Sequence, residues 1–527
     1  MTKSKSNAHI LIKNTGWVYF GKLVSQVLGL IASILVIRKL DVDVYGTFSF
    51  LLGLFSVFQL FILSPVKDLL NRFIPELSMN NHMNALKRLA IYSTIISIIL
   101  TGLMLACFAI FQGPIAKFFN INQFDLHFNA FMWYVITFGI KSMIEVIFTS
   151  LLLHKHSSTY NIFSYLARAI LYFAFLPLLD VNLLLNIESI VSVVFIIFAV
   201  ILIIRKYKTI TNLKDTPYDG PPLTKRVLRY GSLSMMNELG AGVVGKTSDY
   251  YIISAMSNAY NVGLYGFALK IYDMFYKVLP VREFETVLRP LFFKKFTGEN
   301  EGMGLNQMYN FIIKILLPIF LAPFVYFVVF GLPVINIVFD PKYADAYVIT
   351  CISLLTNVIA GVFYPLPFVI QLKERVEISL ISKVVVIFSL GAGILFMKWY
   401  GIVGVAIATM LGGLLKNLLM WYMARNLDNI SIHRAVYSKT IIFSAILFII
   451  FLPFSSFYNS LTGLIIGSLI FTITYACFII IVNPFNKNDY DVLNKLLHTH
   501  PKISKLVLKM ESVTSKLVTL RKRLFSL

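Results

Sequence analysis

The feature that most constrains this chain is a series of apolar runs, each about 20 residues long, that continues from near its start almost to its end. A run of this length can cross a bilayer as an α-helix, which satisfies its backbone hydrogen bonds internally. Windows of about 19 residues place about 14 spans, near 16–38, 45–70, 90–112, 126–153, 160–179, 183–204, 227–254, 262–281, 309–330, 346–371, 377–398, 402–424, 439–459 and 461–483. Because the mean hydropathy is +0.78 and only 14% of residues are charged, the sequence predicts an all-α polytopic membrane protein.

One span occurs twice with its flanking residues. The copies begin DVDVYGTFSFLLGLF and NVGLYGFALKIYDMF, so that Tyr45-Gly46 aligns with Tyr265-Gly266. Each copy continues to a proline and then to an arginine close to a second proline. Leu153–His156 aligns with Leu372–Arg375 at a similar offset of about 220 residues. Two repeats at one spacing predict two similar halves, an arrangement that recurs in secondary transporters with the substrate site between the halves.

The expected regions are a cytoplasmic N-terminus (1–15), an N-terminal lobe (16–204), a cytoplasmic linker with prolines (205–226), a C-terminal lobe (227–424), two further helices (425–483) and a basic tail (484–527). Lys and Arg concentrate in the connections on one side, and the positive-inside rule then predicts that both termini are cytoplasmic. The tail is interpreted as an amphipathic helix on the anionic inner leaflet, with a coiled-coil or partner contact and disorder as the alternatives.

Basic residues within the expected spans point to function. They are Lys22, Lys67, Lys141, Arg168, Arg229, Lys246, Lys270, Lys277, Lys314, Lys383 and Lys416. A charge at mid-bilayer costs about 2.5–3.5 kcal/mol, so each needs water, a counter-charge or a span end. For any single residue, pairing or snorkelling is the favoured interpretation. Because basic residues outnumber acidic ones in the spans, the set favours a water-filled cationic cavity that attracts an anion such as phosphate or pyrophosphate.

Position in the span and the spacing of partners separate these residues into three groups. Near inner span ends, from which a charge can snorkel to the interface, lie Arg229, Lys67, Lys277 and Lys314. Lys141, Lys246 and Lys270 each have an acidic residue three or four positions away on the same helix. Lys22, Arg168, Lys383 and Lys416 have none at that spacing.

Two acidic residues are candidates for coupling transport to H⁺ or Na⁺. Glu238 and Asp249 share one expected span, although simple ion pairing of Asp249 with Lys246 explains that residue equally well. The sequence predicts no metal site and no other cofactor, since the three cysteines lie in apolar runs and are interpreted as packing residues.

Gly240–Thr247 reads GAGVVGKT and matches the phosphate-binding loop pattern. That loop works between a strand and a helix of a soluble α/β domain, whereas this segment lies in an apolar run. Close helix approach through the glycines is therefore favoured over ATP binding. A loosened helix that presents Lys246 to an anion is a further interpretation.

Several motifs together resemble one family. The Tyr-Gly after the first span, RFIP after the second, VGLYGFALKIY, PKYADAY before the tenth span and YGIVGVAIATMLGG of the twelfth are similar to the polysaccharide-exporting flippases, of which the O-antigen flippases called Wzx are the nearest type. They belong to the multidrug/oligosaccharidyl-lipid/polysaccharide exporter superfamily. The resemblance implies two pseudo-twofold-related six-helix lobes plus two C-terminal helices. It also implies alternating access for a polyprenyl-pyrophosphate-linked oligosaccharide.

In that family the first, second, seventh and eighth helices line the cavity, which implies that Lys22, Lys67, Lys246, Lys270 and Lys277 lie on or near it. Lys141 and Arg168 complete the expected set of substrate-binding cations. No catalytic residue is expected. The expected location is the bacterial inner membrane. The expected partners are membrane lipids and a polysaccharide polymerase or glycosyltransferase complex, and nucleic acid is not among them.

Three alternatives remain open at this stage. A flippase for a lipid II-type peptidoglycan precursor is a near neighbour. A multidrug antiporter of the same superfamily predicts an acidic cavity, which the excess of basic residues disfavours. A polysaccharide polymerase or ligase needs a sizeable outer loop, and the expected outer loops are short.

Overall fold

The computed structural model describes residues 2–80, 82–120, 124–150, 154–210, 224, 226–228, 230–232, 246–279, 281, 305–373, 375–427, 434–482 and 489. Within these ranges the regular structure consists of helices without a strand, which confirms the predicted all-α class. Most of the expected linker, and the expected tail apart from Asp489, lie outside the described residues.

The chain forms two compact units. The first comprises Met1–Lys270 and Gly393–Val405, and the second comprises Ile271–Ala392 and Ala406–Leu527. One boundary falls inside α11 (Ala259–Val278), and the short insertion falls inside α16 (Val376–Ala424). The division into lobes at 16–204 and 227–424 stays a prediction.

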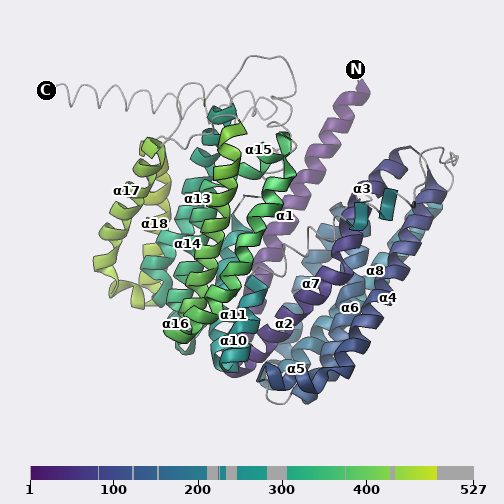
Figure 1. The fold of residues 1–527 in the computed structure, drawn as a ribbon, viewed down its shortest axis with the longest axis horizontal. Coiled ribbons are helices and arrows are strands. Elements are labelled where there is room, and N and C mark those ends of the chain that lie inside the picture. The colour runs from purple at the N-terminus through teal and green to yellow at the C-terminus, as the bar shows by residue number, and fades with distance from the viewer. Residues whose placement is uncertain are drawn as a thin grey trace. The chain divides into compact units, whose positions relative to one another are not determined.

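The first unit is a bundle of long helices (Figure 1). They are α1 (Thr2–Lys39), α2 (Val42–Ile62), α3 (Ser64–Met79), α4 (Met83–Ile110), α5 (Gln112–Phe118), α6 (Phe124–Ser150), α7 (His154–Ala174), α8 (Val181–Ile210), α10 (Lys246–Met256) and the first part of α11. α1 packs along α7, α6 packs along α8, and α3 contacts both α4 and α6. These pairings position the charged residues of α6, α7 and α8 against one another.

The expected span over 45–70 is interrupted in the structure. α2 ends at Ile62, and α3 begins at Ser64 with Pro65 in its first turn, where a missing backbone N–H costs no helical hydrogen bond. The part of this segment that is long and apolar enough to cross a membrane is Val42–Phe61. α3 is amphipathic, since one face is buried against α4 and α6 while Lys67 and Arg72 are exposed.

The second unit is built around α13 (Leu305–Val334), which packs against α14, α17 and α18. Its other elements are η2 (Ile335–Phe339), η3 (Pro341–Ala346), α14 (Tyr347–Val362), α15 (Leu366–Leu372), the parts of α16 outside Gly393–Val405, η4 (Arg425–Leu427), α17 (Arg434–Phe451), η5 (Leu452–Phe454), η6 (Phe457–Asn459) and α18 (Leu461–Val482).

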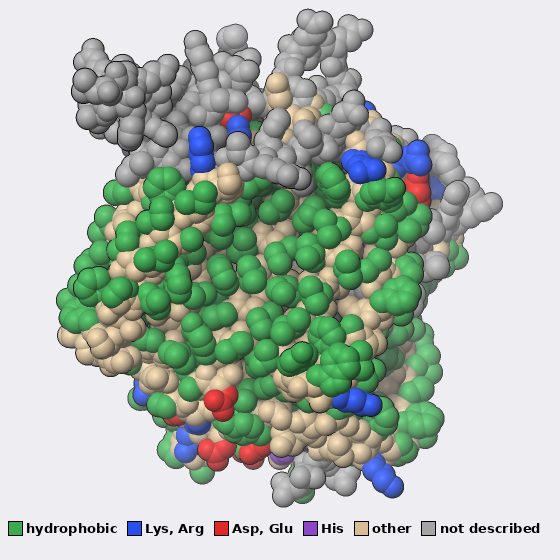
Figure 2. Space-filling view, turned by 60° about the vertical axis from the view of Figure 1, so that its left-hand side comes forward, with side chains coloured by type: hydrophobic (Ala, Val, Ile, Leu, Met, Phe, Trp, Pro, Cys, Tyr) green, Lys and Arg blue, Asp and Glu red, His purple; other side chains and the backbone are tan. Residues whose placement is uncertain are grey.

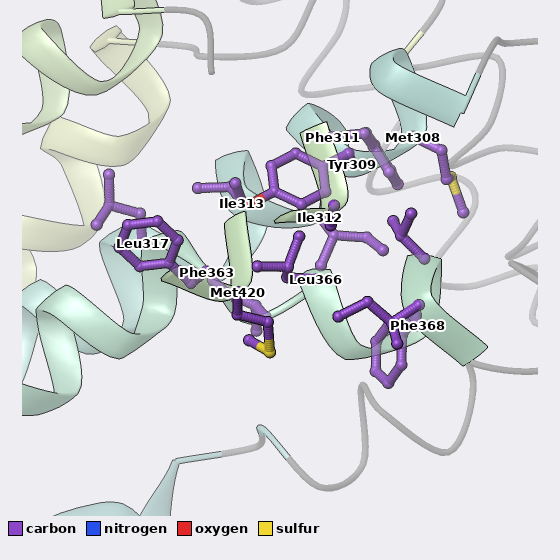
Figure 3. Close-up of a cluster of buried hydrophobic side chains, with 14 of the residues drawn as sticks. Met308, Tyr309, Phe311, Ile312, Ile313, Leu317, Phe363, Leu366, Phe368 and Met420 are labelled. Carbon is purple, nitrogen blue, oxygen red and sulfur yellow. The ribbon is translucent and has the colours of Figure 1, made fainter. Parts of the chain in front are cut away.

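A cluster of buried side chains joins α13 to α15 and to the end of α16 (Figure 3). Tyr309, Phe311 and Ile312 of α13 are fully buried, and they lie with Leu366 of α15 and Met420 of α16. Inside a bilayer lipid is as apolar as these side chains, so close van der Waals packing holds such helices together. The cluster thereby fixes α15 and the second arm of α16 relative to α13.

α16 contains a sharp break that the sequence predicted between two spans. Gly401 has φ +58° and ψ −146°, a left-handed backbone conformation that glycine adopts without a side-chain clash. The helix therefore divides into two arms, which correspond to the expected spans at 377–398 and 402–424.

Side-chain caps begin several helices at the loops that follow a span. Asp180 accepts a hydrogen bond from the Leu183 N–H at 2.7 Å, and Ser460 accepts one from the Gly463 N–H at 3.0 Å. Asn258 caps α11 in the same way. Such caps satisfy N–H groups that have no partner within the helix, and short polar loops suffice to reverse the chain.

Ten helical segments of the described part are long and apolar enough to span a membrane, and the broken α16 accounts for one of them. On α4 and α18 many large apolar side chains are exposed, including Ile95 and Ile99 on α4. Figure 2 shows a face with a band of hydrophobic side chains and with charged residues toward its two ends. This pattern is that of a multi-pass membrane protein. The total of about 14 spans stays a prediction.

The repeated Tyr-Gly pair lies where α2 and α11 make backbone contact in the first unit. A Cβ atom placed on Gly46 would lie 1.9 Å from the Ala259 carbonyl oxygen, and one on Gly263 would lie 2.1 Å from the Val42 carbonyl oxygen. A Cβ on Gly266 would meet the Ser49 side chain at 2.6 Å. The two copies of the repeat therefore pack against each other through glycines that allow backbone approach.

We expect Gly46→Ala to lower stability by about 1–3 kcal/mol, because the added methyl group displaces backbone that cannot move cheaply. Gly139→Ala on α6 is the matched control, since a Cβ there meets nothing within 4 Å and alanine favours a helix over glycine by about 0.5–1 kcal/mol. The measurement is the temperature at which detergent-purified protein loses its monodisperse peak in size-exclusion chromatography. Equal midpoints for the two variants would contradict the contact.

Candidate functional site

The buried charges of the first unit meet where α6, α7 and α8 pack together. Arg168 and Tyr172 lie one turn apart on α7, and Glu188 faces them from α8. Arg168 Nη2 lies 2.9 Å from Glu188 Oε2, and the Tyr172 hydroxyl donates a hydrogen bond of 2.7 Å to Glu188 Oε1. The Arg168 guanidinium also lies 5.0 Å from the centre of the Tyr165 ring. Arg168 and Glu188 side chains are only 9% and 15% exposed, so this is a buried ion pair.

The counter-charge of Arg168 comes from a neighbouring helix. Sequence spacing identified partners on the same helix only, and it therefore missed Glu188. The signal that could have found the pair is one glutamate in α8, a helix otherwise strongly apolar around that position. With its charge balanced by Glu188, Arg168 joins α7 to α8, and its expected role in substrate binding stays a prediction.

Lys141 is buried on α6. Its Nζ atom lies 4.5 Å from the centre of the Phe138 ring and 6.0 Å from that of Phe195 on α8. An ammonium group over aromatic rings gains cation–π energy. Lys141 is thereby held between aromatic rings of α6 and α8 inside the first unit.

Asp249 is a buried carboxylate at the contact between α10 and α11. The Tyr265 hydroxyl donates a hydrogen bond of 2.5 Å to its Oδ2 atom, and Tyr265 belongs to the repeated Tyr-Gly pair. On the same helix, the Tyr251 hydroxyl donates to the Gly53 carbonyl oxygen at 3.1 Å, which ties α10 to α2. One of the two predicted ion-coupling residues is thus buried beside the repeat.

The other expected cations occupy varied positions. Lys22 on α1 and Lys270 on α11 are half-buried, whereas Lys67 on α3 and Lys277 on α11 are exposed. Lys67 also lies beyond the span Val42–Phe61. Lys246 is the first residue of α10, and its side chain lies outside the described part.

Glu238 and most of the segment GAGVVGKT lie outside the described residues. Only its last two residues fall in α10. The coupling role of Glu238 and the interpretations of the glycine-rich segment stay predictions.

In the second unit, Lys314 is balanced by a partner distant in sequence. Its Nζ atom lies 2.6 Å from Asp489 Oδ2, and both side chains are buried. One turn earlier on α13, Asn310 accepts a hydrogen bond of 2.7 Å from the Tyr437 hydroxyl of α17. The charge of Lys314 is thus balanced inside the second unit.

Lys383 and Lys416 instead line a cavity of about 370 Å³ in the second unit. Both were counted among the intramembrane cations but not among the expected site residues. Gln371, Ser382 and Asn417 line the same cavity, together with aromatic rings of α11, of α15 and of the turn between α14 and α15. The sequence signal that could have identified this pair is one lysine on each of two spans joined by a short turn, since such spans run antiparallel.

Comparisons with known proteins agree with this fold. The family model described as "Polysaccharide biosynthesis protein" matches residues 11–294. An uncharacterized membrane protein of Methanocaldococcus jannaschii, MJ1068, is 24% identical over 429 residues, which cover 75% of this chain and 79% of that protein.

Two solved structures are similar in fold. The lipid II flippase MurJ in an inward closed conformation matches with a TM-score of 0.69 and 14% identity, over 88% of this chain and 97% of that one. An inward-facing multidrug resistance MATE family transporter of the MOP superfamily matches with a TM-score of 0.59 and 14% identity, over 77% of this chain and 94% of that one. These likenesses confirm that the helices are arranged in a fold like that of MurJ and the MATE transporters.

The buried pair predicts strong coupling between Arg168 and Glu188. Arg168→Gln leaves a buried carboxylate without its cation, and we expect a loss of about 3–5 kcal/mol. The double variant Arg168→Gln/Glu188→Gln should lose much less than the sum of the two single variants. Thermal unfolding of purified protein measures all three, with the exposed Lys117→Gln as the control, and strictly additive losses would refute the pairing.

Proposed function

Because this chain belongs to the polysaccharide biosynthesis protein family, we propose that it is a flippase that carries a lipid-linked oligosaccharide across the membrane. The proposed cargo is a repeat unit of a surface polysaccharide, such as O-antigen, on a polyprenyl-pyrophosphate carrier. The observation that carries the proposal is the family match over residues 11–294. The MurJ-like fold over 88% of the chain supports it.

The chemistry of the cargo suits the charges of this chain. A pyrophosphate carries negative charge at neutral pH, and Lys or Arg binds phosphate oxygens through charge-assisted hydrogen bonds. Lys22 and Lys270 are half-buried on α1 and α11, and Arg168 and Lys314 have carboxylate partners. We infer that Lys22, Lys67, Lys246, Lys270 and Lys277 contribute to the substrate-binding surface, with Lys141 deeper in the first unit.

Transport of this kind requires movement and binding but no bond cleavage. We infer alternating access, in which the cargo enters from the cytoplasmic side and leaves on the outer side. An ion gradient then drives the return, with Asp249 or Glu238 as the group that binds H⁺ or Na⁺. The burial of Asp249 supports this role, because a carboxylate is kept inside a membrane at a cost and therefore commonly serves transport.

Two related functions have weaker support. The likeness to MurJ makes a lipid II-type peptidoglycan precursor the second candidate cargo. Multidrug antiport has less support, because the excess of intramembrane basic residues would repel cationic drugs. A polymerase or ligase is disfavoured by the short loops around Asp180, Asn258 and Ser460.

The proposed setting is the bacterial inner membrane, with both termini in the cytoplasm. Membrane lipids surround the apolar faces. A polysaccharide polymerase or a glycosyltransferase complex is the proposed protein partner, because one would use the product of flipping and the other would supply the substrate.

The test is export of the lipid-linked oligosaccharide in cells that carry Lys246→Ala or Lys270→Ala at normal protein levels. We expect export to fall about tenfold, since loss of a charge-assisted contact to phosphate removes about 1.4 kcal/mol or more. Lipid-linked intermediate should accumulate on the cytoplasmic side. Lys117→Ala, at an exposed position on α5, is the control.

Unaltered export in both variants would remove these lysines from the site. Normal export in cells without the chain would reject the flippase function itself.

A further inference from the structure

The cavity around Lys383 and Lys416 lies wholly within the second unit. Its volume of about 370 Å³ falls within the usual range of small-molecule sites. Its wall contains Tyr276 of α11, Tyr364 before α15, Gln371 of α15 and both arms of α16. None of the expected substrate-binding cations lines this cavity. The cavity is therefore a different site from the expected one.

The two arms of α16 bring the lysines together. The break at Gly401 reverses the helix, and Gly412 then packs against Ser389, where an added Cβ would lie 2.3 Å from the Ser389 Cβ atom. In this antiparallel register Lys416 is level with Lys383. Two residues that are far apart in sequence thus reach one cavity because a glycine turn and a close glycine contact set the register.

The cavity is rich in hydrogen-bond donors and cationic. Besides the two ammonium groups, the amides of Gln371 and Asn417 line it. The Ser382 hydroxyl also lines it but donates its hydrogen bond to the Ser379 carbonyl oxygen at 2.9 Å. None of the described residues that line it is Asp or Glu. Two like charges in a partly desolvated site repel each other, and an anion bound between them offsets that repulsion. Lysine is a common phosphate-binding residue.

The remaining wall is aromatic and apolar. Tyr276 stacks on Tyr272 with their rings nearly parallel, and Tyr364 meets Phe368 edge to face. Phe363 and Met420 also line the cavity and belong to the buried cluster in Figure 3. The wall is therefore anchored in the packed core around α13, and the charged groups are held on a rigid support.

We propose that this cavity is an anion-binding site for a phosphate group carried on a membrane-borne head group. Lys383 and Lys416 hold the phosphate oxygens, while the amides of Gln371 and Asn417 complete the hydrogen bonds. Where the phosphate belongs to the lipid-linked cargo, the inference rests on the proposed flippase function. An anionic phospholipid head group has the same chemistry and is the other source.

The test uses full-length protein in nanodiscs of phosphatidylcholine alone, with sodium pyrophosphate as the probe. Thermal unfolding is followed at increasing pyrophosphate, and sodium chloride of equal ionic strength is the reference. We expect a saturable rise in melting temperature for the wild type, because a ligand that binds the folded state stabilises it. The apparent affinity should fall at least about tenfold in Lys383→Gln, in Lys416→Gln and in the double variant.

Lys439→Gln is the matched control, since this lysine is exposed on α17 of the same unit and does not line the cavity. Its response should equal that of the wild type. The single variants keep the test decisive if the double variant does not fold. Equal pyrophosphate responses in the wild type and the Lys383 and Lys416 variants would overturn the proposal, as would no saturable response in the wild type.

Nanodiscs that contain phosphatidylglycerol distinguish the two sources. Loss of the pyrophosphate response in these discs would support a site occupied by phospholipid, and its persistence would support a site reserved for the cargo. Binding is measured without transport, so the two proposals can fail separately. Normal export with no pyrophosphate binding would reject the cavity alone, and pyrophosphate binding with export independent of the chain would reject the flippase function alone.

Discussion

A charge in a low-dielectric interior must be compensated, and the helices of this protein are arranged around that requirement. Arg168 is held by Glu188 and Tyr172 between α7 and α8, and Lys314 is held by Asp489. Removing one member of such a pair leaves the other charge buried, which is far more costly than the pair itself is favourable. The pairs therefore restrict how the helices can be arranged more than they add to stability.

Close packing of helices at glycine residues is the second constraint on the structure. At Gly46 and Gly263 the α2 and α11 backbones lie so close that no side chain fits between them. At Gly412 the two arms of α16 also pack closely, there against the side chain of Ser389. Lipid surrounds these helices instead of water, so tight packing of small residues replaces the hydrophobic effect as the force that holds them together.

The intramembrane charges have two kinds of surroundings. Arg168 and Lys314 have carboxylate partners, which restrict how the helices around them pack. Lys383 and Lys416 share a cavity with uncharged donors, which makes the second unit a place where an anion can be held. Asp249 is a candidate ion-binding group, and it accepts a hydrogen bond from Tyr265 of the repeat. It is therefore connected to the glycine contact between α2 and α11. Binding of an anion in the cavity or of an ion at Asp249 would alter the packing of the helices around that site.

The sequence alone determined the class of fold, because an apolar run of bilayer length satisfies its backbone hydrogen bonds in lipid by forming a helix. It also identified the repeat, the reversal near Gly401 and the family, since local order and spacing carry that information. The expected second span at 45–70 extended beyond the end of α2 at Ile62, since a separate amphipathic helix begins at Ser64. Only the tertiary structure revealed that Glu188 balances Arg168, that Asp489 balances Lys314 and that Lys383 meets Lys416. Helical periodicity relates residues three or four positions apart, whereas these partners come from different helices or arms, and their meeting depends on how those helices pack.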